Sequence, residues 1–161
     1  MVYTMQIHVD GGCRGNGKPW AIGAAAAARK NRKGNFTQSW TTVLPSDPTP
    51  TNQRAEIAAI IIALKAALIK YQTLNTAPYL RLTIWSDSRY AIGCMTEWVK
   101  KWMNNGWVNA AGREVANRDL IEKAVGLARD VKRVGRVKYV FIPRDENEYA
   151  DKLCNACMDK Q

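Results

Sequence analysis

Acidic residues are scarce in this sequence, which has 14 Asp and Glu against 24 Lys and Arg and a formal net charge of +10. So basic a chain favours a polyanionic partner, either a nucleic acid or an anionic membrane surface. A generally basic protein without such a partner would have the same composition. Charge alone therefore puts nucleic acid only modestly ahead.

Long apolar runs are also missing. The longest, Ala55 to Ile69, is interrupted by Glu56 and Lys65 and is too short to span a bilayer. No signal peptide precedes the first strand pattern, and the four cysteines show no framework typical of secreted proteins. The spacing of Cys154 and Cys157 favours a reduced, packed helix face over zinc or redox chemistry. These absences predict an intracellular protein that does not enter a membrane.

The composition that remains is typical of a globular protein, with 47% hydrophobic residues and six Trp and six Tyr in 161 residues. This length supports a single domain, residues 1–161, with a good core. No repeat, low-complexity tract or long linker divides the chain.

The predicted elements begin with three strands and continue with alternating helices and strands. Strands are expected over residues 2–10, 20–30, 35–43, 80–86 and 136–142, with a turn-rich loop over residues 11–17. Helices are expected from Thr51 or Asn52 to about residue 71, over residues 88–103 and 117–131, and from Asp145 or Glu146 onward. This order predicts an α/β fold with a mixed five-stranded sheet, three antiparallel strands followed by βα units, and helices packed on its faces.

Two acids, Asp10 and Asp87, each follow an apolar strand pattern. Ligands gather at the carboxyl ends of parallel strands, so two neighbouring strands would bring these carboxylates together. Glu56 shares a helical stripe with Ile60 and several alanines, and it therefore points at the sheet. Burying an unpaired carboxylate costs on the order of several kcal/mol, so a metal cation or a basic side chain must balance its charge. Asp151 lies at the margin of the apolar face of the last helix.

Each of these acids has an ordinary structural alternative. Asp10 could be a turn residue, and Asp87 could be the N-cap of the following helix. Glu56 could cap the first helical turn with equal merit, and for Asp151 alone a surface role is the better interpretation. The convergence of two strand ends and two helix faces nevertheless favours one pocket. Mg²⁺ held between carboxylates, water and a substrate phosphate would explain why so few acids cluster.

Four segments carry these acids: Ile7–Gly12 (IHVDGG), Thr51–Glu56 (TNQRAE), Ile84–Ser88 (IWSDS) and Asn147–Asp151 (NEYAD). In this order they resemble the four acidic motifs of type 1 ribonuclease H, and Trp98–Asn117 is similar to the handle region of the cellular eukaryotic enzymes. The resemblance covers essentially the whole chain. Each motif is weak by itself, but five in the right order are specific.

The resemblance implies a ribonuclease H-like fold and endonucleolytic hydrolysis of the RNA strand of an RNA–DNA hybrid, with 5′-phosphate products. Asp10, Glu56, Asp87 and Asp151 would be the catalytic residues and the metal ligands. They would hold two Mg²⁺ ions when substrate is bound, with Mn²⁺ as an alternative, so that no covalent nucleophile is needed. The partner would be the hybrid, bound by a monomer.

The resemblance also implies a substrate-binding surface. The matched positions are Gly11, Gly12, Asn16, Thr51, Asn52, Gln53, Trp98, Trp102 and Asn117. The first three would lie at the minor groove, where 2′-hydroxyls distinguish RNA from DNA. Asn52 and Gln53 would approach base edges and sugars, while Thr51 and Asn117 would grip a phosphate of the DNA strand. The two tryptophans would face DNA sugars, with core packing as an equal alternative for Trp102.

Two positions depart from the family pattern. Thr49 stands where an Arg normally joins the phosphate pocket, so this pocket is weaker or Arg54 or Arg113 compensates. The stretch Ile142–Glu148 is short and lacks the usual histidine, and the only histidine, His8, lies on a strand and cannot replace it. This loss puts turnover in doubt rather than the metal site. A catalytically weak module that binds hybrids or double-stranded RNA is therefore the alternative function.

Overall fold

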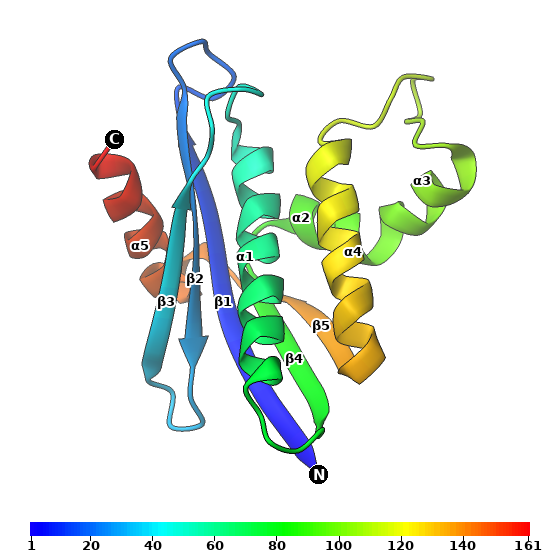
Figure 1. The fold of residues 1–161 in the computed structure, drawn as a ribbon. Helices are drawn as coiled ribbons and strands as arrows, with labels where there is room; N and C mark the ends of the chain where they lie inside the picture. The colour runs from blue at the N-terminus through cyan, green and yellow to red at the C-terminus, as the bar shows by residue number, and fades with distance from the viewer.

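The computed structural model describes residues 1–161 and contains one five-stranded sheet with helices on both faces (Figure 1). The strands are β1 (Val2–Arg14), β2 (Ile22–Lys30), β3 (Phe36–Val43), β4 (Tyr79–Ser86) and β5 (Gly135–Phe141). The helices are α1 (Asn52–Gln72), α2 (Arg89–Gly93), η1 (Cys94–Trp98), α3 (Val99–Asn105), α4 (Arg118–Val134), η2 (Arg144–Glu146) and α5 (Glu148–Asp159). The strand order is β3-β2-β1-β4-β5, with antiparallel β1–β2 and β2–β3 pairs and parallel β1–β4 and β4–β5 pairs. The predicted mixed five-stranded sheet is confirmed.

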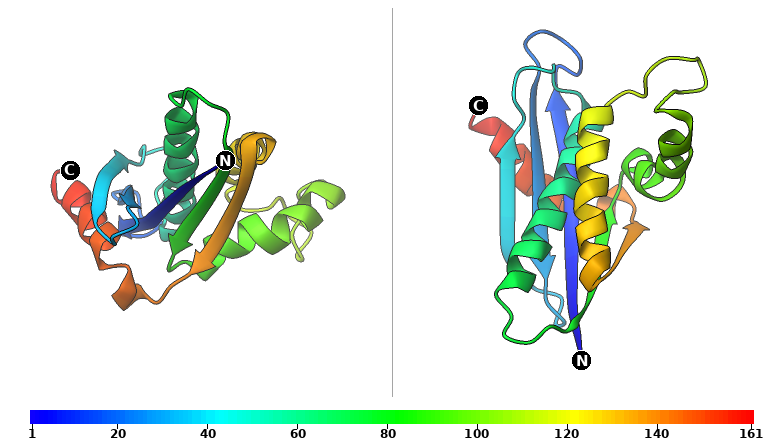
Figure 2. Two further views of the ribbon diagram at one scale, coloured as in Figure 1. Left: turned by 90° about the horizontal axis from the view of Figure 1, so that it is seen from below. Right: turned by 45° about the vertical axis from the view of Figure 1, so that its right-hand side comes forward.

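The main core lies between the sheet and the helices α1 and α4. Alternate strand residues such as Ile7 of β1 and Ile84 of β4 are fully buried there, against Ile60 and Leu64 of α1. On the other face, α5 packs over β2, where Cys154 and Met158 contact two strand alanines. The view from below shows α1 and α4 on one side of the sheet and α5 at the edge of the other (Figure 2). None of the helices combines the length and apolar character that a membrane-spanning segment needs.

The strand β1 runs four residues beyond the predicted end at Asp10, so the loop expected over residues 11–17 was wrong for residues 11–14. Pairing with the parallel strand β4 stops at Val9 and Ser86, but pairing with the antiparallel strand β2 continues to Arg14 and Ile22. The glycines that suggested a turn are held in the sheet by this second ladder. A fork therefore opens between β1 and β4 directly after their last pair.

The segment predicted as one helix over residues 88–103 is divided into three parts. A short helix α2 and the helix α3 are separated by one turn of π-helix, η1. The last helix also differs from the prediction, because a 3₁₀ turn, η2, precedes it and α5 begins only at Glu148. Both breaks change the type of helical hydrogen bond within one turn, and the sequence pattern does not mark such a change.

The first turns of α1 pass directly over β1. The hydroxyl of Thr51 accepts a hydrogen bond from the backbone N–H of Arg54 at 3.1 Å and so caps the helix, as predicted. A Cβ atom at Gly11 would overlap the backbone of Ala55 and Glu56. Only glycine allows this approach, which brings Glu56 to the fork between β1 and β4.

We expect Gly11→Ala to lower the free energy of unfolding by about 2–3 kcal/mol, because α1 must move away from β1. Urea denaturation measures this loss. Gly126→Ala in α4 is the control, since a Cβ there meets nothing within 4 Å and a helix interior favours alanine. Equal stability of Gly11→Ala and the wild type would show that the contact is not tight.

Candidate active site

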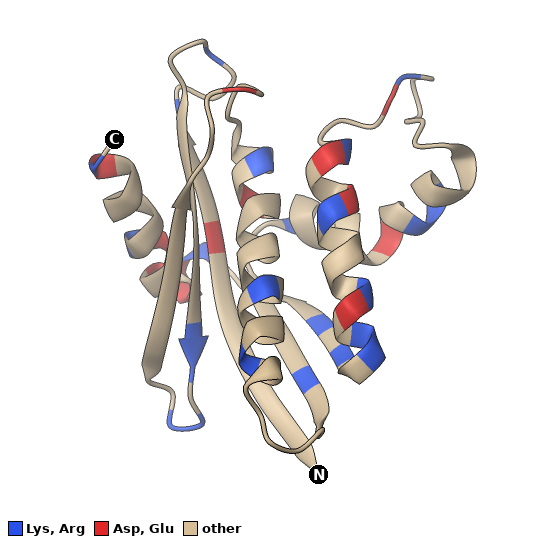
Figure 3. Cartoon of the chain, in the orientation of Figure 1, with Lys and Arg blue, Asp and Glu red and all other residues tan.

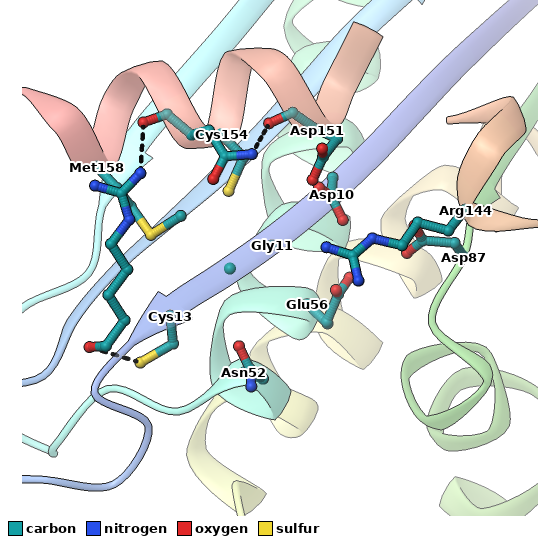
Figure 4. Close-up of a pocket in the computed structure, with 13 residues that line it drawn as sticks. Asp10, Gly11, Cys13, Asn52, Glu56, Asp87, Arg144, Asp151, Cys154 and Met158 are labelled. Carbon is teal, nitrogen blue, oxygen red and sulfur yellow. Dashed lines mark hydrogen bonds between the residues drawn. The ribbon is translucent and has the colours of Figure 1, made fainter. Parts of the chain in front are cut away.

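Three carboxylates meet at the fork. Asp10 follows the last β1–β4 pair, Asp87 follows β4, and Glu56 reaches across from α1. One carboxylate oxygen from each lies within 4.8 Å of the others. Asp151, in the first turn of α5, lies beside Asp10 but outside this set of three (Figure 4). All four acids singled out in the sequence therefore line one region.

These acids form the wall of a cavity of about 440 Å³. Five segments supply its lining, namely β1, α1, the end of β4, η2 and α5, so residues far apart in the sequence meet there (Figure 4). The lining residues are Asp10, Gly11, Gly12, Cys13, Arg14, Asn52, Glu56, Asp87, Arg144, Asp151, Cys154, Asn155 and Met158. Most of them are polar, so the cavity suits a charged ligand better than an apolar one.

Burial and the closeness of like charges make it unfavourable for these carboxyl groups to be ionised. Burial, with the added charge of Asp87, raises the pKa of Asp10 to about 8. Burial and the charges of Asp10 and Asp87 raise the pKa of Glu56 well above its ordinary value. Burial also raises the pKa of Asp87, against the opposing charge of Arg144. The cluster therefore favours either protonation or a bound cation.

The donor set fits a hard divalent cation. The Oε2 atom of Glu56 is buried and has no hydrogen-bond partner. An orphaned carboxylate oxygen in a pocket with two further carboxylates is the arrangement that Mg²⁺ and Mn²⁺ bind through oxygen ligands. The residues present could thus hold a metal ion, with Asp10, Glu56 and Asp87 as the best placed ligands.

The structural alternatives for two acids do not hold. The N-cap of α2 is Ser88, whose hydroxyl accepts a hydrogen bond from the N–H of Ala91 at 3.1 Å, so Asp87 does not cap this helix. The N-cap of α1 is Thr51, so Glu56 does not cap that helix either. Both acids are left free to face the cavity.

Two residues at the site escaped notice as functional candidates. The side-chain amide of the buried Asn147 donates to the carbonyl of Val9 at 2.8 Å and ties the start of α5 to the end of the β1–β4 ladder. Arg144 points its guanidinium group toward Glu56 and Asp87 (Figure 4). Its charge lowers the pKa of both acids against the effect of burial. The only sequence signal for Arg144 was a basic residue in the short stretch without histidine.

The expected substrate residues gather beside this cavity at the start of α1. The side-chain oxygen of Asn16 accepts a hydrogen bond from the N–H of Asn52 at 2.9 Å, which fixes the β1–β2 loop to the helix. Gln53 accepts a hydrogen bond from the side chain of Asn117 at 3.5 Å. Gly12 packs against Met158, where a Cβ would come within 2.9 Å of the methionine methyl group. The contacts of Asn16 and Gln53 join the β1–β2 loop, the start of α1 and the start of α4, whereas Gly12 faces α5.

The arginine next to the expected phosphate-binding residues is paired with an acid. Arg54 lies within 3.5 Å of the side-chain oxygen of Asn117, in the neighbourhood that Thr49 leaves without an arginine. Its guanidinium group also forms two hydrogen bonds to Asp119, at 3.0 and 2.7 Å. The amide of Asn117 meanwhile donates to the hydroxyl of Tyr90 at 2.9 Å. The arginine beside Asn117 is thus already paired with an acid.

The tryptophans of the handle, Trp98–Asn117, form a row. The ring centroids of Trp98 and Trp102 are 6.1 Å apart, and those of Trp102 and Trp107 are also 6.1 Å apart. Trp98 is 38% exposed, Trp107 is buried, and Trp102 packs partly against the core. Trp102 is therefore partly packed against the core and partly exposed beside Trp98, which is compatible with both of the roles considered for it.

Comparisons with known proteins agree on one family. The family model described as RNase H matches residues 3–158. A ribonuclease H of Pelobacter propionicus is 34% identical over 77% of this chain and 66% of its own length. One of Syntrophomonas wolfei is 34% identical over 82% of this chain and 81% of its own length. The crystal structure of LC11-RNase H1 in complex with RNA/DNA hybrid is 25% identical, with a TM-score of 0.64 and 97% of both chains covered.

The family match covers nearly the whole sheet and all four acidic segments, and the aligned relatives are far more similar than a shared fold requires. With the carboxylate cluster at the fork between β1 and β4, these findings have one meaning. The chain belongs to the ribonuclease H family.

Proposed function

We propose that residues 1–161 form a single catalytic domain that cleaves the RNA strand of an RNA–DNA hybrid as a monomer. The observation that carries the proposal is the meeting of three carboxylates around a buried, partnerless oxygen of Glu56. The enzymes of this family are metal-dependent hydrolases, and the alternative of a binding module without turnover would not need so costly a cluster. Four cysteines kept as thiols would suit an intracellular compartment.

Asp10, Glu56, Asp87 and Asp151 would hold the metal ions, and we favour Mg²⁺ over Mn²⁺ as the physiological ion. When bound, two such ions supply an activated water and stabilise the leaving 3′ oxygen. The carboxylates of Asp10, Glu56 and Asp87 contribute the closest ligand set. Asp151 stands at the edge beside Asp10, so its share of the binding is smaller.

The protein's own residues would orient the substrate around this centre. Asn147 fixes the strand end that carries Asp10, through its hydrogen bond to Val9. The backbone N–H of Asn52 donates to the side chain of Asn16, so a contact of the Asn16 side chain with a ribose 2′-hydroxyl is positioned before binding. Arg144 would place a positive charge next to the scissile phosphate, where negative charge develops during cleavage.

The DNA strand would be held farther from the cavity. Thr51 and Asn117 would grip one DNA phosphate, and Gln53 would approach base edges and sugars. Gly11 and Gly12 would lie at the minor groove. Trp98 and Trp102 would present their rings to the DNA sugars. Deoxyribose lacks the polar 2′-hydroxyl of ribose, so it packs more readily against an apolar ring. Because Arg54 is paired with Asp119, we expect this grip to be weaker than one with a free arginine.

Replacing the metal ligands tests the proposal. We expect Asp10→Asn and Glu56→Gln to lower kcat on a strand-labelled hybrid by about 10³-fold or more, because each removes a charge that balances the metal ions. Asp151→Asn should lower kcat by about 10–100-fold, because this acid lies outside the closest set. Gel analysis of the labelled RNA strand in Mg²⁺ and in Mn²⁺ gives these rates.

The Asp10→Asn variant should still bind the hybrid. A lower cleavage rate would then come from the chemical step and not from weaker substrate binding. Asp47→Asn, in the exposed loop before α1, is the control for the loss of one acid and should cleave normally. Unchanged cleavage by Asp10→Asn, or cleavage of the DNA strand at the same rate as the RNA strand, would refute the assignment.

The raised pKa of Asp10 predicts how the metal-free protein responds to pH. The folded value of about 8 lies above the ordinary value of 3.8, so this group favours the folded state fully below pH 3.8 and loses that contribution as the pH rises through 8. In EDTA at pH 8.5, Asp10→Asn should therefore melt about 5 °C or more above the wild type. At pH 4 the two should melt together.

Calorimetry across this range, with and without Mg²⁺, checks the prediction. Added Mg²⁺ should raise the Tm of the wild type at pH 8.5 much more than that of Asp10→Asn, because it binds only the folded carboxylate cluster. A wild type that is as stable as the variant in EDTA at high pH would contradict the crowding of charge at this site.

Arg144 provides a separate test. We expect Arg144→Ala to lower kcat by about 10–100-fold, because a preorganised positive charge is lost beside the phosphate. Arg144→Lys should recover part of the rate, since it restores the charge but not the planar geometry. Arg133→Ala, on the exposed side of α4, is the control for the loss of one arginine. Equal rates for Arg144→Ala and this control would remove Arg144 from the site.

A further inference from the structure

One face of the sheet is left open over β1, β4 and β5. The helices α1 and α4 cover the other face, and α5 covers this one only near β2 (Figure 2). The strand registers align the residues of this face in rows across the three strands, from exposed residues in the first row to the buried His8 in the last. The rows are Thr4–Arg81–Arg136, Gln6–Thr83–Lys138 and His8–Trp85–Val140, in the order β1, β4, β5.

Up to the carboxylate cavity, the charge on this open face is of one sign; Asp10 and Asp87 follow on the same alternation and belong to that cavity. Arg81 stands directly opposite Arg136 in the parallel ladder, and Lys138 follows in the next row. Lys30 of β2 joins them opposite Gln6. Strands β2 to β5 contain no acid at all, and Figure 3 shows the blue positions of β4 and β5 without red beside them on either strand.

None of these cations pairs with an acid, although Lys30 lies over the ring of Phe36 at 5.3 Å from its centroid. All the ion pairs of the structure lie elsewhere, on α4, at the start of α1 and near the end of α5. Like charges directly opposite each other in a ladder destabilise a sheet. The acids nearest along the chain are Asp87, which belongs to the carboxylate cluster, and Asp130, which pairs with Arg133. A fold that keeps Arg81 against Arg136 is thus suited to an external anion.

Aromatic rings border the same cations. The rings of Trp85 and His8 are stacked at 5.8 Å and 16°, and Phe36 meets His8 edge-on at 5.4 Å. The indole N–H of Trp85 donates to the side-chain oxygen of Gln6 at 3.1 Å, which fixes the ring before any ligand arrives. The ring of Tyr149 stacks on Phe36 at 4.1 Å and extends the row toward α5.

We propose that this open sheet face binds single-stranded nucleic acid, as a second site separate from the hybrid-binding surface at the start of α1. Cations that track a phosphate backbone and a flat aromatic platform for bases are the two elements of sequence-tolerant single-strand binding. Trp85 lies two residues before Asp87, so a strand on this face leads to the cavity. The single-stranded tail of a hybrid would be held there while its duplex part occupies the cleavage site.

The test uses the whole chain in EDTA, so that binding is measured without cleavage. Fluorescence anisotropy follows labelled oligo-U and oligo-dT of about 12 nucleotides. The variant is Arg81→Gln/Arg136→Gln, and the control is Arg129→Gln/Lys132→Gln on α4, which removes the same charge from exposed, unpaired positions on the other side of the sheet. We expect about tenfold weaker binding for the sheet variant and less than twofold for the control. The salt slope should fall by about 1.4 in the sheet variant, since each phosphate contact contributes about 0.7.

A second measurement separates this site from the hybrid surface. A hybrid with a single-stranded tail should bind the wild type more tightly than a blunt hybrid, and the sheet variant should lose this advantage while it cleaves the blunt hybrid at the wild-type rate. Equal losses in the two double variants, or complete displacement of the oligonucleotide by a blunt hybrid, would overturn the proposal. Binding of phosphatidylserine vesicles through the same arginines, with no effect on oligonucleotides, would overturn it in favour of a membrane. An effect on oligo-U alone or oligo-dT alone would assign the site to that strand.

Discussion

The close contact of α1 with β1 at Gly11 is the constraint on which the site depends. It lets a carboxylate from a helix reach two carboxylates from strand ends, although the three lie far apart in the chain. The same closeness removes water from Glu56 and crowds like charges. The folded protein therefore holds electrostatic free energy that a bound cation would release, and metal binding and folding stability become linked.

The sheet could be predicted because its strands carry clear alternation, as in β4, where Leu80, Leu82 and Ile84 are buried between exposed or partly exposed neighbours. The helix α1 was equally plain, since Thr51 caps it and one stripe is apolar. The end of β1 could not be predicted. Two consecutive glycines signal a turn locally, but here the ladder with β2 and the packing of α1 keep them extended, and both are tertiary effects.

The acids of the site were predicted from convergence and family resemblance together, whereas their neighbours were not. Asn147 and Arg144 reach the site because the segment after β5 folds back over the strand ends. No local sequence pattern predicts this path. The pairing of Arg54 with Asp119 is similar, because residues 65 positions apart meet only after α1 and α4 have packed. The sequence thus predicted the carboxylates that would bind metal, but it did not predict the contacts of Arg144 or the pairing of Arg54 with Asp119.

The π-helical turn η1 has a consequence for the direction of the handle. One extra residue in a helix rotates everything beyond it by about 100° relative to a continuous α-helix. The outward direction of Trp98 and Trp102 therefore depends on chain length within Cys94–Trp98 rather than on any residue that would touch a duplex. Loss or gain of one residue in this turn would swivel the aromatic row while the carboxylates stayed in place. Length variation at this turn offers a route by which the same chemistry could serve duplexes presented at different angles.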